Sequence, residues 1–156
     1  MFSNELICKI LEFIDENINK KITVDELAKR FYYNRYYIMK LFKKEIGLTI
    51  FDYINNLKIY NSILMINNSN KSLLTIAIEN GFYSIEYFSE IFRKIIGVSP
   101  SVYKKTYYFK YNKFNDCSEL CINNVIMLNT KINQINKYKQ NLKPQKNLVR
   151  KISIFN

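Results

Sequence analysis

Two basic pairs that recur fifty residues apart are the side chains of this sequence best suited to binding chemistry. Lys43–Lys44 and Arg93–Lys94 each close an amphipathic segment, and a glycine, Gly47 or Gly97, follows each pair. Clustered cations favour a polyanionic partner, most often nucleic acid or an anionic membrane. The spacing therefore indicates a polyanionic partner that the chain contacts at two places.

The residue types that the common catalytic sites need are scarce in this chain. Its 156 residues include no histidine and only three glycines, which excludes imidazole catalysis and a glycine-rich phosphate loop. Cys117 and Cys121 have the spacing of half a metal site, but no second pair completes a tetrahedron of ligands. We predict a protein that is not an enzyme, with no catalytic residue, no cofactor and no metal site.

The charge is large but unevenly distributed. The formal net charge is +11, from 24 basic and 13 acidic side chains. Residues 1–105 hold 15 basic and 11 acidic side chains, a net of +4, and residues 106–156 hold 9 and 2, a net of +7. Two interpretations remain open, which are nucleic-acid binding and an A/T-rich codon bias that favours lysine. Net charge alone therefore does not locate a binding surface in this chain.

The pattern is an internal repeat. Residues 27–53 and 76–103 align with Tyr37 on Tyr87, Phe42 on Phe92 and Gly47 on Gly97, all at an offset of 50. Leu27–Ala28 aligns with Ile76–Ala77 at an offset of 49, so the second copy has one extra residue in its turn. A run of matches with one slip, placed in a turn, indicates a duplicated supersecondary unit rather than two unrelated helical hairpins.

Each copy predicts a helix, a tight turn and a second helix. Thr23 with Glu26 forms a capping box for the first helix of copy one, and Asn34 and Ser84 are N-caps for the two second helices, near 35–46 and 84–96. Gly47 and Gly97 are the left-handed residues that end them. The predicted buried stripes are Tyr37, Ile38, Leu41 and Phe42, and Tyr87, Phe88, Ile91 and Phe92.

Further helices are expected around the repeat. Residues 4–18 carry an amphipathic stripe that completes the first unit, and Ser99–Pro100 starts a last short helix. Residues 50–66, capped by Thr49, predict a linker helix of roughly 25 Å at 1.5 Å per residue. The predicted fold class is all-α.

These residues resemble the AraC/XylS family of bacterial transcription regulators. The motifs are Leu27–Ala28, Leu41–Lys43, Gly81–Phe82 with Ser84, Tyr87–Ser89, and Ser99–Pro100 with Tyr103. The resemblance covers about residues 5–105 and implies a seven-helix domain with helix-turn-helix units at about 5–48 and 67–105. It implies a regulator that inserts two recognition helices into adjacent major grooves of promoter DNA. Those grooves lie roughly 34 Å apart, which a rigid linker helix can span.

The site residues follow from the resemblance and from the faces that the stripes leave exposed. The expected base-reading residues are Tyr36, Met39 and Lys40 in the first recognition helix, and Ile85, Glu86, Ser89 and Glu90 in the second. The expected phosphate contacts are Arg35, Lys43, Lys44, Ser84, Arg93 and Lys94. Lysine can donate to guanine O6 and N7, tyrosine and methionine can contact a thymine methyl, and phosphate contacts position without specifying.

The sequence departs from the family pattern in three ways. Glu86 and Glu90 lie one turn apart on the expected DNA face, where they would either accept from cytosine N4 or repel phosphate. Tyr32 stands where the family favours glycine; a bulky residue at positive φ is strained, so a rearranged first turn is expected. Lys58 stands where the linker often carries arginine, so a bidentate phosphate contact is expected to be lost.

Residues 106–156 are basic, rich in Asn and Lys, and show little clear periodicity. We interpret them as a partly disordered extension, with a docking element or an extra phosphate contact as the alternative. The extension is too short for an effector domain with its own core, and at most four residues precede the first helix, so no small-molecule effector domain is expected. The sequence contains no uninterrupted apolar run of eighteen residues, so no membrane span is predicted.

Double-stranded DNA is the expected partner, and RNA polymerase is a further candidate. Three cysteines and no export signal favour the cytoplasm. The alternative function is an adaptor or antagonist that binds RNA polymerase or another regulator and has lost part of its DNA contact. DNA binding that weakens steeply with salt would distinguish a regulator from an adaptor.

Overall fold

The computed structural model describes residues 2–109 and 119–142, which form eight helices and no strand. The helices are α1 (Phe2–Glu16), α2 (Val24–Phe31), α3 (Arg35–Ile46), α4 (Ile50–Asn68), α5 (Leu73–Glu79), α6 (Ile85–Ile96), α7 (Pro100–Phe109) and α8 (Glu119–Leu142). The predicted all-α fold is confirmed, and the two helices expected near 35–46 and 84–96 are α3 and α6.

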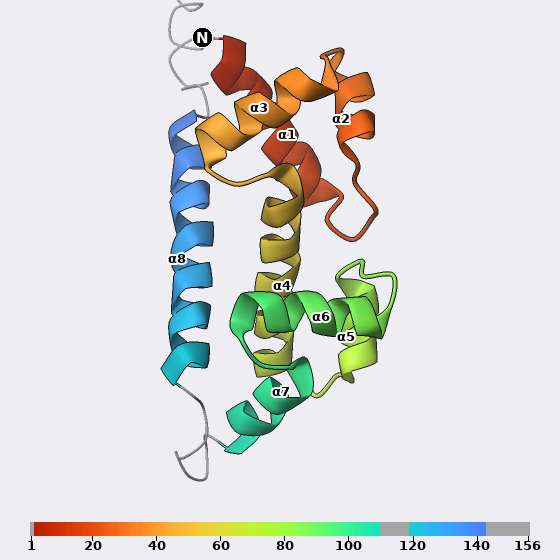
Figure 1. The fold of residues 1–156 in the computed structure, drawn as a ribbon, viewed down its shortest axis with the longest axis vertical. Helices are drawn as coiled ribbons and strands as arrows, with labels where there is room; N and C mark the ends of the chain where they lie inside the picture. Colours follow the sequence, from red (N-terminus) through yellow and green to blue (C-terminus); the bar gives the residue numbers. More distant parts are fainter. Residues whose placement is uncertain (1, 110–118, 143–156) are drawn as a thin grey trace, which may run out of the picture.

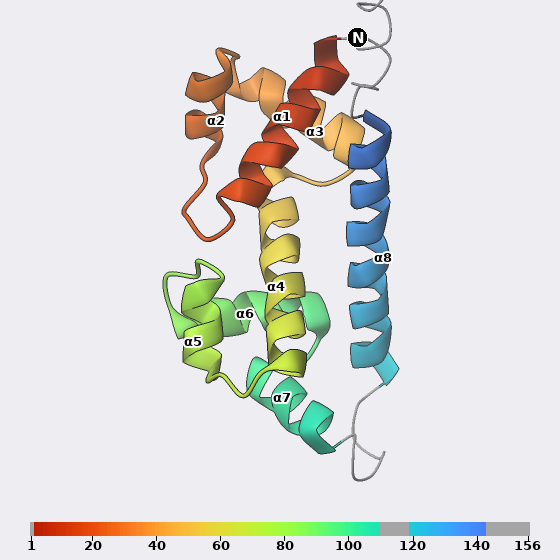
Figure 2. The same cartoon turned by 180° about the vertical axis from the view of Figure 1, so that it is seen from behind.

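The helix α4 forms the axis of the molecule (Figure 1). The first unit, α1–α3, packs at one end of α4, and the second unit, α5–α7, packs at the other. The 19 residues of α4 span about 28 Å at 1.5 Å per residue. The last of the described helices, α8, runs beside α4 over most of its length in both Figure 1 and Figure 2.

Side-chain caps define the helix boundaries as expected. Thr23 accepts a hydrogen bond from the Glu26 amide, Asn34 from the Tyr36 amide, and Ser84 from the Tyr87 amide. Gly47 and Gly97 end α3 and α6 in the left-handed conformation, with φ of 80° and 93°. Local chemistry therefore fixes the start and end of each recognition helix before any tertiary contact is considered.

The first turn is not rearranged. Tyr32 ends α2 with φ 59° and ψ 38°, the left-handed conformation that Gly81 adopts at the same position of the second unit with φ 71°. The tyrosine side chain is 94% exposed and meets no obstacle, so only the backbone strain remains. The first unit therefore makes with a tyrosine the same tight turn that the second unit makes with a glycine.

Two apolar cores lie at the two ends of α4. The first gathers the inward faces of α1 and α3 with Leu27, Tyr53 and Ile54, and the second gathers those of α5 and α6 with Ile59, Ile63 and Ile66. Ile38, Leu41 and Phe42 are buried as predicted, but Tyr37 is 46% exposed and Tyr87 is half-buried. The prediction for Tyr37 was wrong because its ring stacks on Tyr33 at the margin of the buried stripe instead of packing into the core.

The C-terminal extension differs from the sequence-based interpretation over the part that the structure describes. Residues 119–142 form α8, which packs against α1, α4 and α6 rather than standing free. Leu128, Ile132 and Ile135 are buried because their i, i+4, i+7 spacing places them on one face of the helix. The Cys117 half-site lies outside the described residues. None of the described helices is both long and apolar enough to cross a bilayer.

Candidate nucleic-acid interface

The outer face of α3 carries the residues expected to read bases. Burial of Ile38, Leu41 and Phe42 turns the opposite face to solvent, where Tyr36 is 73% exposed and Met39 and Lys40 are also exposed. Lys43 and Lys44 are exposed in the last turn of the same helix. The structure thus brings the apolar and cationic side chains of the first recognition helix onto one accessible surface.

Arg35, an expected phosphate contact, already has partners within the protein. Its guanidinium lies 3.1 Å from the carboxylate of Asp25 in α2 and 5.7 Å from the ring centre of Tyr36. Both charged side chains are about half exposed or more, so solvent screens the ion pair. Arg35 can exchange this weak pair for a phosphate at small energetic expense.

The outer face of α6 combines acidic and basic side chains. Glu86 and Glu90 are exposed one turn apart, and Arg93 and Lys94 are exposed in the last turn. Ile85 is half-buried against the second core, so its side chain is less exposed to solvent than those of the two glutamates. Ser89 is half-buried, and its hydroxyl donates to the Ile85 carbonyl at 2.8 Å. The second recognition helix therefore presents mainly carboxylates where the first presents Tyr36 and Lys40.

A pair of stacked tyrosines joins the preceding turn to the first turn of each recognition helix, and sequence reasoning missed both pairs. The rings of Tyr33 and Tyr37 lie 5.5 Å apart at 17°, and those of Tyr83 and Tyr87 lie 4.5 Å apart at 22°. The two pairs occupy equivalent positions of the repeat, fifty residues apart. The signal was present, because Tyr33 and Tyr83 align as clearly as Tyr37 and Tyr87. Stacking holds each pair of rings at the edge of its recognition helix.

Lys58 does not face the solvent side expected of a phosphate contact. Its side chain is 6% exposed, and its ammonium donates to the Gly81 carbonyl at 2.7 Å and lies 5.4 Å from the Phe82 ring centre. Burial lowers the pKa of Lys58 from its ordinary value. The expected loss of a bidentate phosphate contact agrees with this burial, because the lysine instead holds the turn of the second unit against α4.

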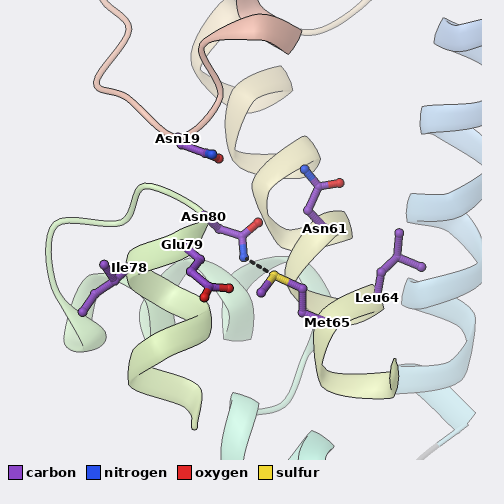
Figure 3. A pocket seen from close by; sticks show the side chains of 7 residues that line it. All are labelled: Asn19, Asn61, Leu64, Met65, Ile78, Glu79 and Asn80. Atoms are coloured by element: carbon purple, nitrogen blue, oxygen red, sulfur yellow. Dashed lines mark hydrogen bonds between the residues drawn. The ribbon is translucent and has the colours of Figure 1, made fainter. Parts of the chain in front are cut away.

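A hollow of about 680 Å³ opens between the α1–α2 loop, α4 and α5 (Figure 3). Asn19 stands across it from Asn80, whose amide lies 3.1 Å from the Met65 sulfur. The carboxylate in its lining, Glu79, is paired with Lys71 at 2.7 Å. Amides, a thioether and aliphatic side chains make up the rest of the lining. The hollow thus lacks a nucleophile with an adjacent base.

Comparison with known proteins identifies the family. A family model described as "Helix-turn-helix domain" matches residues 27–106, which include both recognition helices and the linker helix. The chain belongs to the AraC-type helix-turn-helix family of DNA-binding transcription regulators. The match ends before α8 begins.

Relatives of AraC type align over two thirds of the chain. It is 26% identical over 103 residues to the HTH-type transcriptional activator AarP of Providencia stuartii, covering 66% of this chain and 76% of AarP. It is 32% identical over 99 residues to the melibiose operon regulatory protein of Escherichia coli, covering 64% of this chain but 33% of that protein. The chain therefore spans about a third of the larger relative.

Solved structures show the same fold. The DNA-binding domain of AdpA, in complex with a target DNA, matches with a TM-score of 0.64 at 20% identity over 69% of this chain and 97% of that domain. A protein from Listeria innocua matches with a TM-score of 0.58 at 28% identity over 62% of this chain and 92% of its own. Both comparisons support the double helix-turn-helix architecture.

Proposed function

We propose that this protein regulates transcription by inserting α3 and α6 into successive major grooves of a promoter. The observation that carries the proposal is the repeat of one exposed face, with a basic pair in its last turn, at both ends of a single rigid helix. Successive major grooves on one side of a duplex lie roughly 34 Å apart. The span of α4 together with the width of the units is compatible with that distance.

In the proposed complex, the first recognition helix supplies most of the sequence information. Lys40 donates to guanine O6 and N7, and the exposed Tyr36 and Met39 contact thymine methyl groups. Lys43 and Lys44 neutralise phosphates beside the groove, where they position the helix without reading sequence. The exposure of this face supports the assignment, because the Arg35–Asp25 ion pair that a phosphate would replace is weak.

The second recognition helix contributes mainly contacts to the DNA backbone. Arg93 and Lys94 face solvent and are suited to phosphate, and the capping Ser84 stands at the helix end where backbone amides favour anions. Glu86 and Glu90 project from the remaining face and repel the phosphates. Carboxylate acceptance from cytosine N4 is the other role open to them, although this kind of base contact is less common.

A second candidate function is supported by the same two glutamates. If they prevent α6 from entering a groove, the chain acts as an adaptor or antagonist that binds RNA polymerase or another regulator. Glu86 and Glu90 are exposed together on α6, and the acidic surface that they form supports this candidate.

Selection of binding sites from random duplex DNA, followed by footprinting on the selected site, tests the proposal. We expect two protected segments centred about one helical turn apart and an affinity that falls steeply as salt rises. Protection of a single segment would limit the DNA contact to one unit. Absence of any salt-dependent DNA binding would instead support the adaptor.

A further inference from the structure

The helix α8 bridges the two units, although it lies beyond the residues that match the family. Leu128 and Ile132 are buried in the second core, and Ile135 is buried in the first. The three side chains follow one face of α8, so a single straight helix crosses the boundary between the units. Figures 1 and 2 both show it lying along α4 from the second unit to the first.

Polar contacts attach α8 to equivalent ends of the two recognition helices. The Asn124 amide donates to the Ile96 carbonyl at 3.0 Å in the last turn of α6, and the Tyr138 hydroxyl donates to Glu45 at 3.1 Å in the last turn of α3. Positions 45 and 96 fall in the same turn of the repeat, because Glu45 aligns with residue 95. The helix α8 therefore holds both recognition helices near their C-terminal ends.

A charged cluster strengthens the attachment to the first unit. The Lys139 ammonium donates to the Asp15 carboxylate of α1 at 2.6 Å and lies 5.5 Å from the ring centre of Tyr53 in α4. Lys139 is 15% exposed, so solvent screens this pair less than an open surface pair. One side chain thus connects α8 with two other helices.

On another side of α4 the units touch directly. A Cβ atom placed on Gly81 would lie 2.5 Å from the backbone oxygen of Asn19, so the turn of the second unit rests against the α1–α2 loop of the first. Lys58 of α4 donates to the carbonyl of the same glycine. A hinge motion about α4 would have to break this contact or peel α8 from one of the cores.

We propose that α8 fixes the separation and angle of the two recognition helices, which makes this protein selective for one spacing between the DNA half-sites. The inference rests on the proposed function, in which both helices contact DNA at once. Each added base pair moves the second half-site by about 3.4 Å and rotates it by roughly 35°. With α4 and the Gly81 contact alone, the two units can still pivot about that contact, whereas α8, buried in both cores, blocks the pivot.

The experiment measures the affinity of the full chain for selected sites whose half-site spacing is changed by one and two base pairs in either direction. The first variant is Lys139→Glu, which places two carboxylates side by side at the first unit. Its matched control is Lys137→Glu, the same charge change on an exposed position of α8. The second variant is Ile132→Ser, which weakens the apolar contact with the second core, and thermal melting verifies that each variant is folded.

We expect the wild type and Lys137→Glu to prefer the best spacing over the next by at least about tenfold, and Lys139→Glu to lower that ratio roughly fivefold. Affinity for the best spacing should match between the two charge variants within about twofold. Ile132→Ser, where folded, should relax the spacing in the same way. If Ile132→Ser does not fold, the spacing profile of Lys139→Glu alone tests the inference.

Spacing profiles of Lys139→Glu and folded Ile132→Ser that coincide with the control would overturn the inference while leaving the proposed function intact. A wild type that protects two half-sites but binds all spacings equally would overturn it as well. A wild type without site-specific binding contradicts the proposed function itself. The two failures are therefore distinguishable.

Discussion

Replacement of Gly81 by alanine tests how closely the two units are pressed together. Gly81 has a φ of +71°, a conformation that costs an L residue about 1–2 kcal/mol. Its added Cβ would lie 2.5 Å, 2.6 Å and 2.9 Å from the oxygen, carbonyl carbon and Cα of Asn19, all of them backbone atoms. Since backbone cannot rotate away as a side chain can, the α1–α2 loop or the turn must shift, with a typical cost of about 1–3 kcal/mol.

The backbone cost and the cost of displacing the loop together predict that Gly81→Ala lowers the free energy of unfolding by about 2–5 kcal/mol. Gly47→Ala is the matched control, because Gly47 has a φ of +80° but no atom lies within 4 Å of its Cβ position. This variant should lose only the backbone contribution, about 1–2 kcal/mol. At roughly 3 °C per kcal/mol for a chain of this size, the melting temperatures should separate by several degrees.

Denaturant unfolding of both variants, followed by circular dichroism, measures the difference. A third variant, Tyr32→Gly, changes the equivalent position of the first unit, where the side chain is almost fully exposed. Glycine there relieves the left-handed strain, less its own conformational entropy, so a gain of about 0.5–1 kcal/mol is expected. Equal losses for Gly81→Ala and Gly47→Ala would refute the reasoning, because the contact with Asn19 would then contribute nothing.

Three further outcomes are expected. Lys40→Ala should lose roughly 1–3 kcal/mol of binding to the preferred site and relax one base position in a binding selection, whereas Lys43→Ala should weaken binding to all sequences alike. Glu90→Arg should strengthen binding to every sequence and steepen the salt dependence by about one unit; equal affinity with the wild type on random DNA across a salt titration would contradict the assigned repulsion. Burial and the Glu45 carboxylate raise the pKa of Tyr138 to about 12, so its stabilising contribution is complete below its ordinary value of 10.0 and is lost as pH rises toward 12. Tyr138→Phe should therefore remove part of the stability loss between pH 10 and 12 in an alkaline titration, and identical curves would exclude a contribution from this residue.

The repeat made the double helix-turn-helix arrangement predictable from the sequence. Matching caps and glycines mark the ends of α3 and α6, and these signals depend on only a few neighbouring residues. The exposed positions of α3 also followed from helical periodicity, once Ile38 and Phe42 were assigned to the core. Periodicity failed at Tyr37, since the depth of the core along a helix depends on what packs against it.

Lys58 illustrates a placement that no local pattern contains. Its position in α4 was visible in the sequence, but its direction depends on the turn at Gly81, 23 residues away, whose carbonyl accepts a hydrogen bond from its ammonium. A buried ammonium is tolerated because this hydrogen bond and the nearby Phe82 ring offset part of its lost hydration. Residue type and family pattern both favoured a solvent-facing contact.

The sequence by itself determined the helices of the repeat, their ends and the two exposed recognition faces, because caps, stripes and glycine stops act within one or two turns of the chain. Only the tertiary structure decided the position of α8 and hence the relation between the two units. Among the described side chains of α8, Leu128, Ile132 and Ile135 are the buried apolar ones, and they lie in a segment rich in Asn and Lys, too weak a pattern to identify what the helix packs against. Its contacts join Tyr138 to Glu45 and Lys139 to Asp15 across 93 and 124 residues. Contacts at that separation form only where two folded surfaces happen to match in shape, and shape is a property of the assembled units rather than of any stretch of sequence.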